Sequence, residues 1–235
     1  MSHHVHPYAH RLGTLRDWKS RWFADAGQYQ EYLKGDVTLR DYLVKRLRGM
    51  HVSDIEMERN DKMWKVVIKT ARPGLIIGRS GEGATKLKSE TMSRLARWKI
   101  KTPKEFRIEI EEVRNPESNA AIVGQMVAEG LEKRLPFKRV MKQMVEKVMA
   151  NRDVKGVRVE IAGRLGGADM SRREHVRAGN IPLQTIRADV DFAREKAYLP
   201  YGVIGIQVWI YKGEVFAEKP KAARPGNAEH APQRA

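Results

Sequence analysis

The chain contains, at residues 71–82, the sequence Ala71-Arg72-Pro73-Gly74-Leu75-Ile76-Ile77-Gly78-Arg79-Ser80-Gly81-Glu82. Its centre is a Gly-x-x-Gly turn that follows an apolar run. Backbone without Cβ atoms can lie flat against a sugar-phosphate strand, and glycine adopts positive φ at little cost. The N–H groups that open a following helix point at such phosphates, with the positive end of the helix dipole behind them. The segment therefore predicts a phosphate clamp made by Gly78, Arg79, Ser80 and Gly81.

The same spacing also occurs at Gly163/Gly166 and Gly202/Gly205, so the flanking sequence must decide which turn binds. Alternating and helical periodicities predict secondary structure only around the first turn in the required order. The expected elements are a helix at 39–48, strands at 51–58 and 63–70, a helix at 84–98 and a strand at 106–110. This α-β-β-α-α-β order, with a small sheet covered on one face, is the layout of a KH RNA-binding domain.

The charge balance also favours a polyanionic partner. The 235 residues include 45 Lys and Arg against 29 Asp and Glu, for a net charge of +16. The cations gather at 11–21, 86–104, 134–147 and 164–177, which favours nucleic-acid surfaces over a generally basic soluble protein. No apolar run is long enough for a membrane span and no signal sequence is seen, so we expect no membrane partner. The absence of cysteine fits a reducing cytoplasm.

The rest of the chain predicts a second domain and two flanking segments. We expect an N-terminal arm at 1–37, the KH domain at 38–114, an α+β domain at 115–216 and a disordered tail at 217–235. Asn115 is expected to cap a helix that begins at Pro116 and runs to about residue 135. A second helix at 137–150, with one apolar face, and strands at 156–162, 183–192 and 202–211 complete an α-α-β-β-β unit.

A search for catalytic or cofactor chemistry fails. The segment after Gly78 imitates a nucleotide-binding loop, but Ala84 stands where that loop requires lysine. Asp189 and Asp191 could hold a metal, although salt bridges with Arg187 and Arg194 are the preferred interpretation. The four histidines near the N-terminus, at 3, 4, 6 and 10, lack supporting carboxylates or thiolates. We therefore expect no enzyme, no cofactor and no metal site.

Five motifs, in order, resemble the bacterial small-subunit ribosomal protein S-three family. They are Val5-His6-Pro7 with Arg11-Leu12-Gly13, the segment 71–82, Gly163-Arg164-Leu165-Gly166-Gly167-Ala168, Pro182-Leu183 with Thr185 and Arg187-Ala188-Asp189, and Tyr201-Gly202-Val203-Ile204-Gly205 with Val208-Trp209-Ile210. The resemblance implies a type II KH domain followed by an α+β domain, in the cytoplasmic ribosome. It implies binding to 16S rRNA and mRNA in the head of the small subunit. The implied neighbours are proteins S-ten and S-fourteen, and S-four and S-five near the channel through which messenger enters.

The resemblance also assigns roles to particular cations. Phe137-Lys138-Arg139 with Lys142 matches the family's basic motif in the messenger channel, where these cations would help to separate base pairs. The residues expected at rRNA are Arg11, Arg72, Arg164, Gly166, Gly167, Arg172 and Arg173.

Three alternatives stay open from the residues themselves. The 163–167 segment could be an ordinary loop that needs positive φ, and the basic face of the 137–150 helix could be merely solvated or bound to rRNA. Trp18 and Trp22 could stack on RNA or anchor the arm on the protein. The competing function is a free KH-domain regulator of RNA, or an RNA or DNA repair enzyme.

Overall fold

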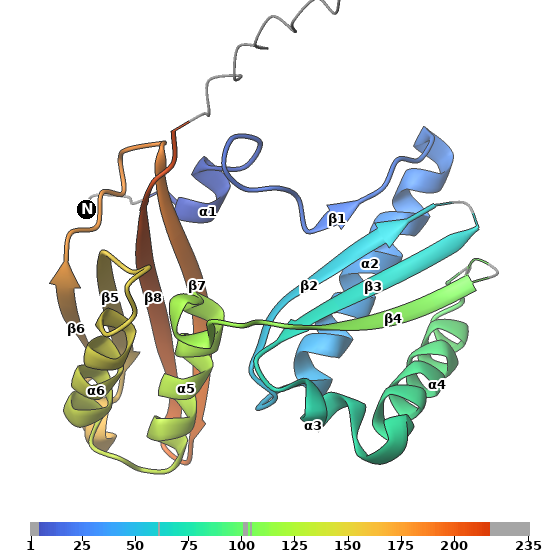
Figure 1. Ribbon diagram of the computed structural model, residues 1–235. Coiled ribbons are helices and arrows are strands. Elements are labelled where there is room, and N and C mark those ends of the chain that lie inside the picture. The colour runs from blue at the N-terminus through green and yellow to red at the C-terminus, as the bar shows by residue number, and fades with distance from the viewer. Residues whose placement is uncertain (1–4, 61, 101–102, 104, 217–235) are drawn as a thin grey trace, which may run out of the picture.

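The computed structural model describes residues 5–60, 62–100, 103 and 105–216, so the tail expected at 217–235 lies outside the described residues. Two four-stranded sheets lie side by side, each with its helices on one face (Figure 1). The architecture is α+β, as predicted.

The first sheet belongs to the α-β-β-α-α-β unit. Strand order is β1-β2-β3-β4, with β2 antiparallel to β3 and β4 parallel to β3. A short N-terminal strand adds to the free edge of β2 in parallel. The elements are β1 (Ser20–Arg21), α2 (Ala26–Arg46), β2 (Val52–Arg59), β3 (Met63–Thr70), α3 (Pro73–Ile77), α4 (Glu82–Arg97) and β4 (Glu105–Glu112).

Helix α2 begins 13 residues earlier than the predicted start at Leu39 and crosses the boundary expected after residue 37. Its first half has little apolar periodicity, and its buried positions there are Gly35 and Asp36. Trp22 of the arm donates a hydrogen bond from Nε1 to Asp36 Oδ2 at 2.7 Å and packs on Tyr29. A tertiary contact with the arm therefore accompanies this half of the helix, and local sequence did not reveal it.

The second sheet has strand order β6-β5-β8-β7 and is antiparallel throughout. Helices α5 and α6 both cover one face of it (Figure 1), and the apolar face of α6 packs there as predicted. The elements are α5 (Ala120–Glu132), α6 (Phe137–Met149), β5 (Gly156–Gly163), β6 (Arg172–Gly179), β7 (Ala188–Leu199) and β8 (Gly202–Glu214).

The prediction of three strands in this domain was wrong in two respects. Strand β6 was missed because it is a polar edge strand whose contacts with the core come from Val176 and Ala178. The strand expected at 183–192 is β7, which starts at Ala188 and continues to Leu199. The segment before it is a connection, and its apolar residues Ile181 and Leu183 pack on the face of the sheet opposite α5 and α6.

The start of α5 also differs from the prediction. Asn115 precedes a 3-10 turn at Pro116–Ser118, and the α-helix begins only at Ala120. Asn119 is the N-cap, with its side-chain oxygen 3.0 Å from the N–H of Ala121. Asp191 of β7 accepts the N–H of Ala120 at 2.9 Å, so the helix start is also held by the sheet beneath it.

Polar contacts join the two halves. Arg48, after α2, forms an ion pair with Glu132 of α5, and its guanidinium lies 4.1 Å from the ring centre of Tyr198. Gln125 donates a hydrogen bond to the carbonyl of Val52 at 2.8 Å. These contacts fix the position of the first sheet relative to α5.

Candidate nucleic-acid interface

The Gly-x-x-Gly turn connects α3 to α4 and has a left-handed backbone. The φ angles are 70° at Gly78, 52° at Ser80 and 81° at Gly81, which is the N-cap of α4. Left-handed φ favours glycine, and the two glycines stand at the ends of the turn where the chain reverses. Arg79 and Ser80 project from the turn as exposed residues.

A close contact between backbones sets the position of this turn. A Cβ atom at Gly83 would lie 2.5 Å from the carbonyl oxygen of Ile76, closer than any real Cβ contact. Glycine at this position therefore lets α4 start directly against the end of α3. The side chains of Leu75 and Ile77, 55% and 37% exposed, leave an apolar surface beside the cationic turn. The sequence did not single out these two residues, although their run before the turn was visible.

The charged residues around the turn favour the binding of phosphate groups. Arg79 and Arg72 are both exposed, and neither forms an ion pair with any described residue. Glu82, in the first turn of α4, is an acidic neighbour that complements the helix dipole. A strand of RNA at this turn would contact the guanidinium of Arg79 directly, and that of Arg72 at the N-terminal end of α3.

The second group of candidate residues lies at the N-terminal end of α6. Lys138, Arg139 and Lys142 are exposed and form no ion pair within the described residues. Val140, Met141, Val145 and Val148 make the buried face of the same helix. Lys138 and Arg139 lie in the first turn of α6, where cations face the positive end of the helix dipole and disfavour the helix slightly. Folding alone therefore gives no reason for these charges.

The third group is the loop between β5 and β6. Gly166 and Gly167 have φ of 69° and 82°, and a Cβ atom on either would meet open space. Arg164 organises the loop by donating to the carbonyl of Ala168 at 2.9 Å and pairing with Asp169. The positive φ agrees with the ordinary-loop interpretation, and the open space leaves room for a partner.

Arg172 and Arg173 begin strand β6 instead of lying in the loop. They pair with Glu174 at 3.2 Å and with Glu160 at 3.1 Å, and both side chains stay more than half exposed. The guanidinium of Arg172 also lies 5.5 Å from the ring centre of Phe137, the first residue of α6. The loop and the basic end of α6 are therefore neighbours. In Figure 1 the α5–α6 connection and the α3–α4 turn also lie at the same, lower end of the molecule.

Arg11 does not belong to this surface, and the structure corrects its expected role at rRNA. Its side chain is fully buried, and its guanidinium donates to backbone carbonyls of the arm and of the connection before β7. The acceptors are Pro7, Pro182, Leu183, Thr185 and Ala188, at 2.5–3.4 Å. Arg11 is thus a structural residue, and burial lowers the pKa of its guanidinium.

The structure decides the role of one of the two arm tryptophans and the partner of Asp189. Trp22 anchors the arm through Asp36, whereas Trp18 is 60% exposed and remains available for stacking. Asp189 does make a salt bridge, but with Arg16 of the arm at 2.7 Å and not with its sequence neighbours. Arg187 pairs instead with Glu214 at 2.8 Å.

A KH unit joined to a second α+β domain, with exposed cations at the turns of both, defines an RNA-binding protein. Sequence models of two families match the chain: the KH domain over residues 38–118, and "Ribosomal protein S3, C-terminal domain" over residues 127–210. No helix among the described residues is long and apolar enough to cross a membrane.

Curated relatives match nearly the whole chain. A protein of Caldicellulosiruptor saccharolyticus is 41% identical over 226 residues, which are 96% of this chain and 99% of that protein. One of Nitrosococcus oceani is 41% identical over 229 residues (97% and 99%), and one of Photobacterium profundum is 42% identical over 229 residues (96% of each). All three are named "Small ribosomal subunit protein uS3". The chain belongs to this uS3 family, whose members are structural, non-enzymatic proteins of the cytoplasmic ribosome.

Proposed function

We propose that the protein binds 16S rRNA in the head of the small subunit and lines the channel through which messenger RNA enters. In this role the KH turn at 78–81 contacts RNA phosphates. Lys138, Arg139 and Lys142 contact messenger RNA and help to separate its base pairs. By resemblance, its neighbours are proteins S-ten and S-fourteen, with S-four and S-five around the channel.

The observation that carries the messenger contact is the charge at the start of α6. Three cations are exposed there and form no ion pair among the described residues, and two of them, Lys138 and Arg139, sit in the first turn, where the helix dipole disfavours cations. Because none of them lies on the buried face, they can hold phosphates without disturbing the core. The nearby Arg172 extends the same basic surface across the ring of Phe137.

Such a surface can assist unwinding without catalysing a reaction. When a base pair at the mouth of the channel opens spontaneously, cations that hold the separated strands disfavour its reclosure. The cations therefore shift an equilibrium by binding one of its states better. The stepping of the ribosome then makes the opening directional.

The test replaces Lys138, Arg139 and Lys142 together with Ala. Translation through a message with a stable hairpin should slow more than translation through an unstructured message, while subunit assembly is retained. The matched control removes three exposed cations at the opposite end of the same helix and just after it, Lys147, Arg152 and Lys155. Equal slowing on both messages, or loss of assembly by the first variant, would contradict the messenger contact.

The competing function, a free RNA regulator, makes a different prediction about the whole protein. A subunit component should remain with small subunits through a high-salt wash, because many contacts hold it. A free KH regulator should be released, since its few phosphate contacts weaken steeply with salt.

A further inference from the structure

The face of the second sheet that lies opposite α5 and α6 forms a surface on which only Arg173 has been given an expected role. Side chains alternate along strands, and the core positions of β5 and β8 include Val159, Ile161, Ile206 and Val208. Their neighbours therefore point to the other side, which carries no helix over most of its area in Figure 1. The arm covers only the end near Phe192, where the ring of His6 lies 4.7 Å away.

This open face is strongly cationic. Strand pairing places Arg177 opposite Arg158, and Lys196 opposite Gly205. The cations of the face are Arg158, Arg173, Arg177, Arg194 and Lys196. Glu160, a carboxylate between these cations, is 4% exposed and lies 2.6 Å from Arg158 and 3.1 Å from Arg173. Arg177 and Lys196 form no ion pair with any described residue.

The end of the face next to the loop between β5 and β6 is flat because its residues are small. Gly205 of β8 pairs with Ala162 on one side and with Lys196 on the other, and Ala162 pairs in turn with Arg173. A Cβ atom at Gly205 would meet only the carbonyl oxygen of Ala162 at 3.8 Å, an ordinary contact. Packing within the chain therefore does not require glycine here. A glycine inside a strand commonly marks a place where another backbone approaches closely.

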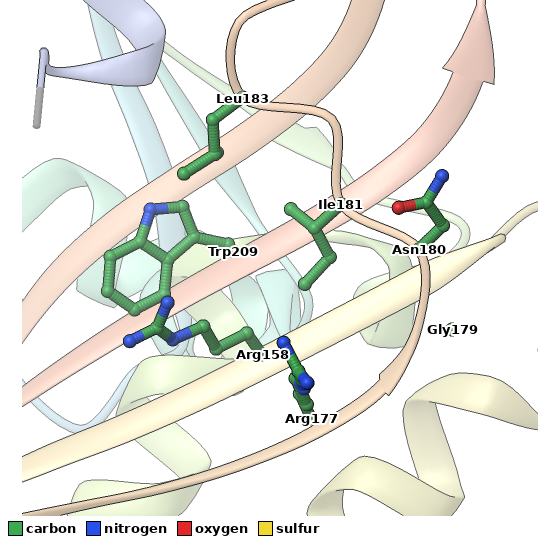
Figure 2. A pocket seen from close by; sticks show the side chains of 7 residues that line it. All are labelled: Arg158, Arg177, Gly179, Asn180, Ile181, Leu183 and Trp209. Carbon is green, nitrogen blue, oxygen red and sulfur yellow. The ribbon is translucent and has the colours of Figure 1, made fainter.

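The aromatic residues on this face favour contact with a phosphate backbone over stacking with bases. Figure 2 shows the end of the face where Arg158 lies against the indole of Trp209, 5.0 Å from its ring centre. Ile181 and Leu183 line the same hollow of about 140 Å³, and Trp209 and Phe192 are each only 9% exposed. Base-stacking sheets need open rings. Trp209 and Phe192 are covered, and the ring of Tyr198, 54% exposed near the end of β7, already has the guanidinium of Arg48 against it.

We propose that this face binds the sugar-phosphate backbone of 16S rRNA. The RNA strand lies over Gly205 and Ala162, with cations of the sheet on both sides of it. An acidic protein surface is the competing occupant. The choice of rRNA over messenger rests on the proposed function, in which the messenger is held by the cations of α6, on the opposite face of the sheet.

The first test measures binding of the full chain to 16S rRNA at several salt concentrations. Arg177→Gln with Lys196→Gln should weaken binding, and each duplex phosphate that the variant no longer binds should lower the log–log salt slope by about 0.9. Gly205→Leu should weaken binding without any change in charge. The control, Lys34→Gln with Lys45→Gln at exposed positions of α2, removes the same charge and should keep the slope. Parental affinity and slope in both test variants would overturn the proposal.

The second test identifies the occupant within assembled subunits. The chain has no cysteine, so Lys196→Cys provides a unique attachment point for an iron chelate that cleaves nearby RNA backbone. Cleavage of 16S rRNA near this position is expected. Cleavage of messenger alone, or of neither RNA in subunits that contain the protein, would overturn the proposal and point to messenger or to an acidic protein. Alanine at Lys138, Arg139 and Lys142 should leave the rRNA cleavage unchanged, so the messenger contact can fail independently.

Discussion

The Nε group of Arg11 lies 2.5 Å from the carbonyl oxygen of Ala188, 177 residues further along the chain. The remaining donors of this guanidinium bind carbonyls of the arm and of the connection before β7. A single buried side chain therefore ties the N-terminal arm to the start of β7. Charged hydrogen bonds of this kind contribute about 1.5–3 kcal/mol each, and a buried carbonyl that loses its donor is costly.

Replacement of Arg11 by Lys should lower the free energy of unfolding by about 3 kcal/mol, because an ammonium group cannot reach the same set of carbonyls. Urea denaturation measures this change. Arg21→Lys, in an exposed part of the arm, is the control and should change stability by less than about 1 kcal/mol. Affinity of the folded variant for single-stranded RNA should equal that of the parent. Weaker RNA binding with normal stability would restore Arg11 as an RNA contact.

The packing of α3 on α4 makes a second prediction. Gly83→Ala should destabilise the first domain by about 1–3 kcal/mol, since the new methyl group would overlap the carbonyl of Ile76. Gly74→Ala is the matched control in the neighbouring helix, where an added Cβ meets nothing within 4 Å. It should be neutral or slightly stabilising, as is usual for Gly→Ala in a helix. Thermal unfolding of both variants measures the difference, and equal stability would show that the two helices can separate without cost.

These elements show which parts of the fold local sequence can predict. The turn at 78–81 is marked by two glycines three residues apart, and the apolar face of α6 by apolar residues at helical spacing. Both patterns are local, so both features were predicted. Strand β6 was missed because an edge strand with few core contacts has almost no apolar alternation. The first half of α2 was missed because its packing depends on Trp22, which lies outside the helix.

The candidate site was predictable to a similar degree. Exposed cations on regular elements, such as Lys138 and Arg139, follow from helical spacing together with the family resemblance. A buried arginine looks the same in sequence as an exposed one, so the role of Arg11 was misassigned. The partner of Asp189 is Arg16, 173 residues away, and no local pattern could identify it. The cationic face of the second sheet could not be predicted from the sequence, because it depends on the pairing of β6 with β5 and β6 was missed.

The KH turn makes the third prediction. Arg79→Asp with Ser80→Asp should weaken binding of single-stranded RNA while leaving the fold intact, because two carboxylates would replace a guanidinium and a hydroxyl beside the phosphates. The salt slope should fall by about 0.7 for each phosphate that the variant no longer binds. Gln30→Asp with Lys34→Asp on α2 makes the same change in net charge at exposed positions and is the control. Binding of the first variant as tight as that of the parent at low salt would refute the clamp.

The loop before β6 makes the fourth prediction. Arg172→Ala with Arg173→Ala should reduce incorporation into small subunits, since both guanidinium groups remain more than half exposed beside the basic end of α6. Each already has a carboxylate partner in the chain, so removal of the surface ion pairs alone should cost about 1 kcal/mol or less per pair. Stability and incorporation are therefore measured together. Normal incorporation would leave the 163–167 segment as an ordinary loop.

The buried His51 makes the last prediction, which concerns pH. Its side chain is 1% exposed, and burial lowers its pKa, opposed by Glu129, whose Oε1 lies 3.1 Å from Nε2. Arg72 and Lys133 lower the pKa further. The unfolded chain therefore binds a proton below about pH 6.5 that the folded chain resists. The free energy of unfolding should therefore decrease as the pH is lowered below about 6.5, by up to about 1.4 kcal/mol per pH unit. Above that pH this loss is absent.

His51→Asn removes the titration, and asparagine tolerates the φ of 51° at this position. Urea unfolding of parent and variant between pH 5 and pH 8, values chosen around that pKa, should give a steeper decline for the parent. Parallel curves would show that His51 is protonated as readily in the folded protein as in the unfolded chain.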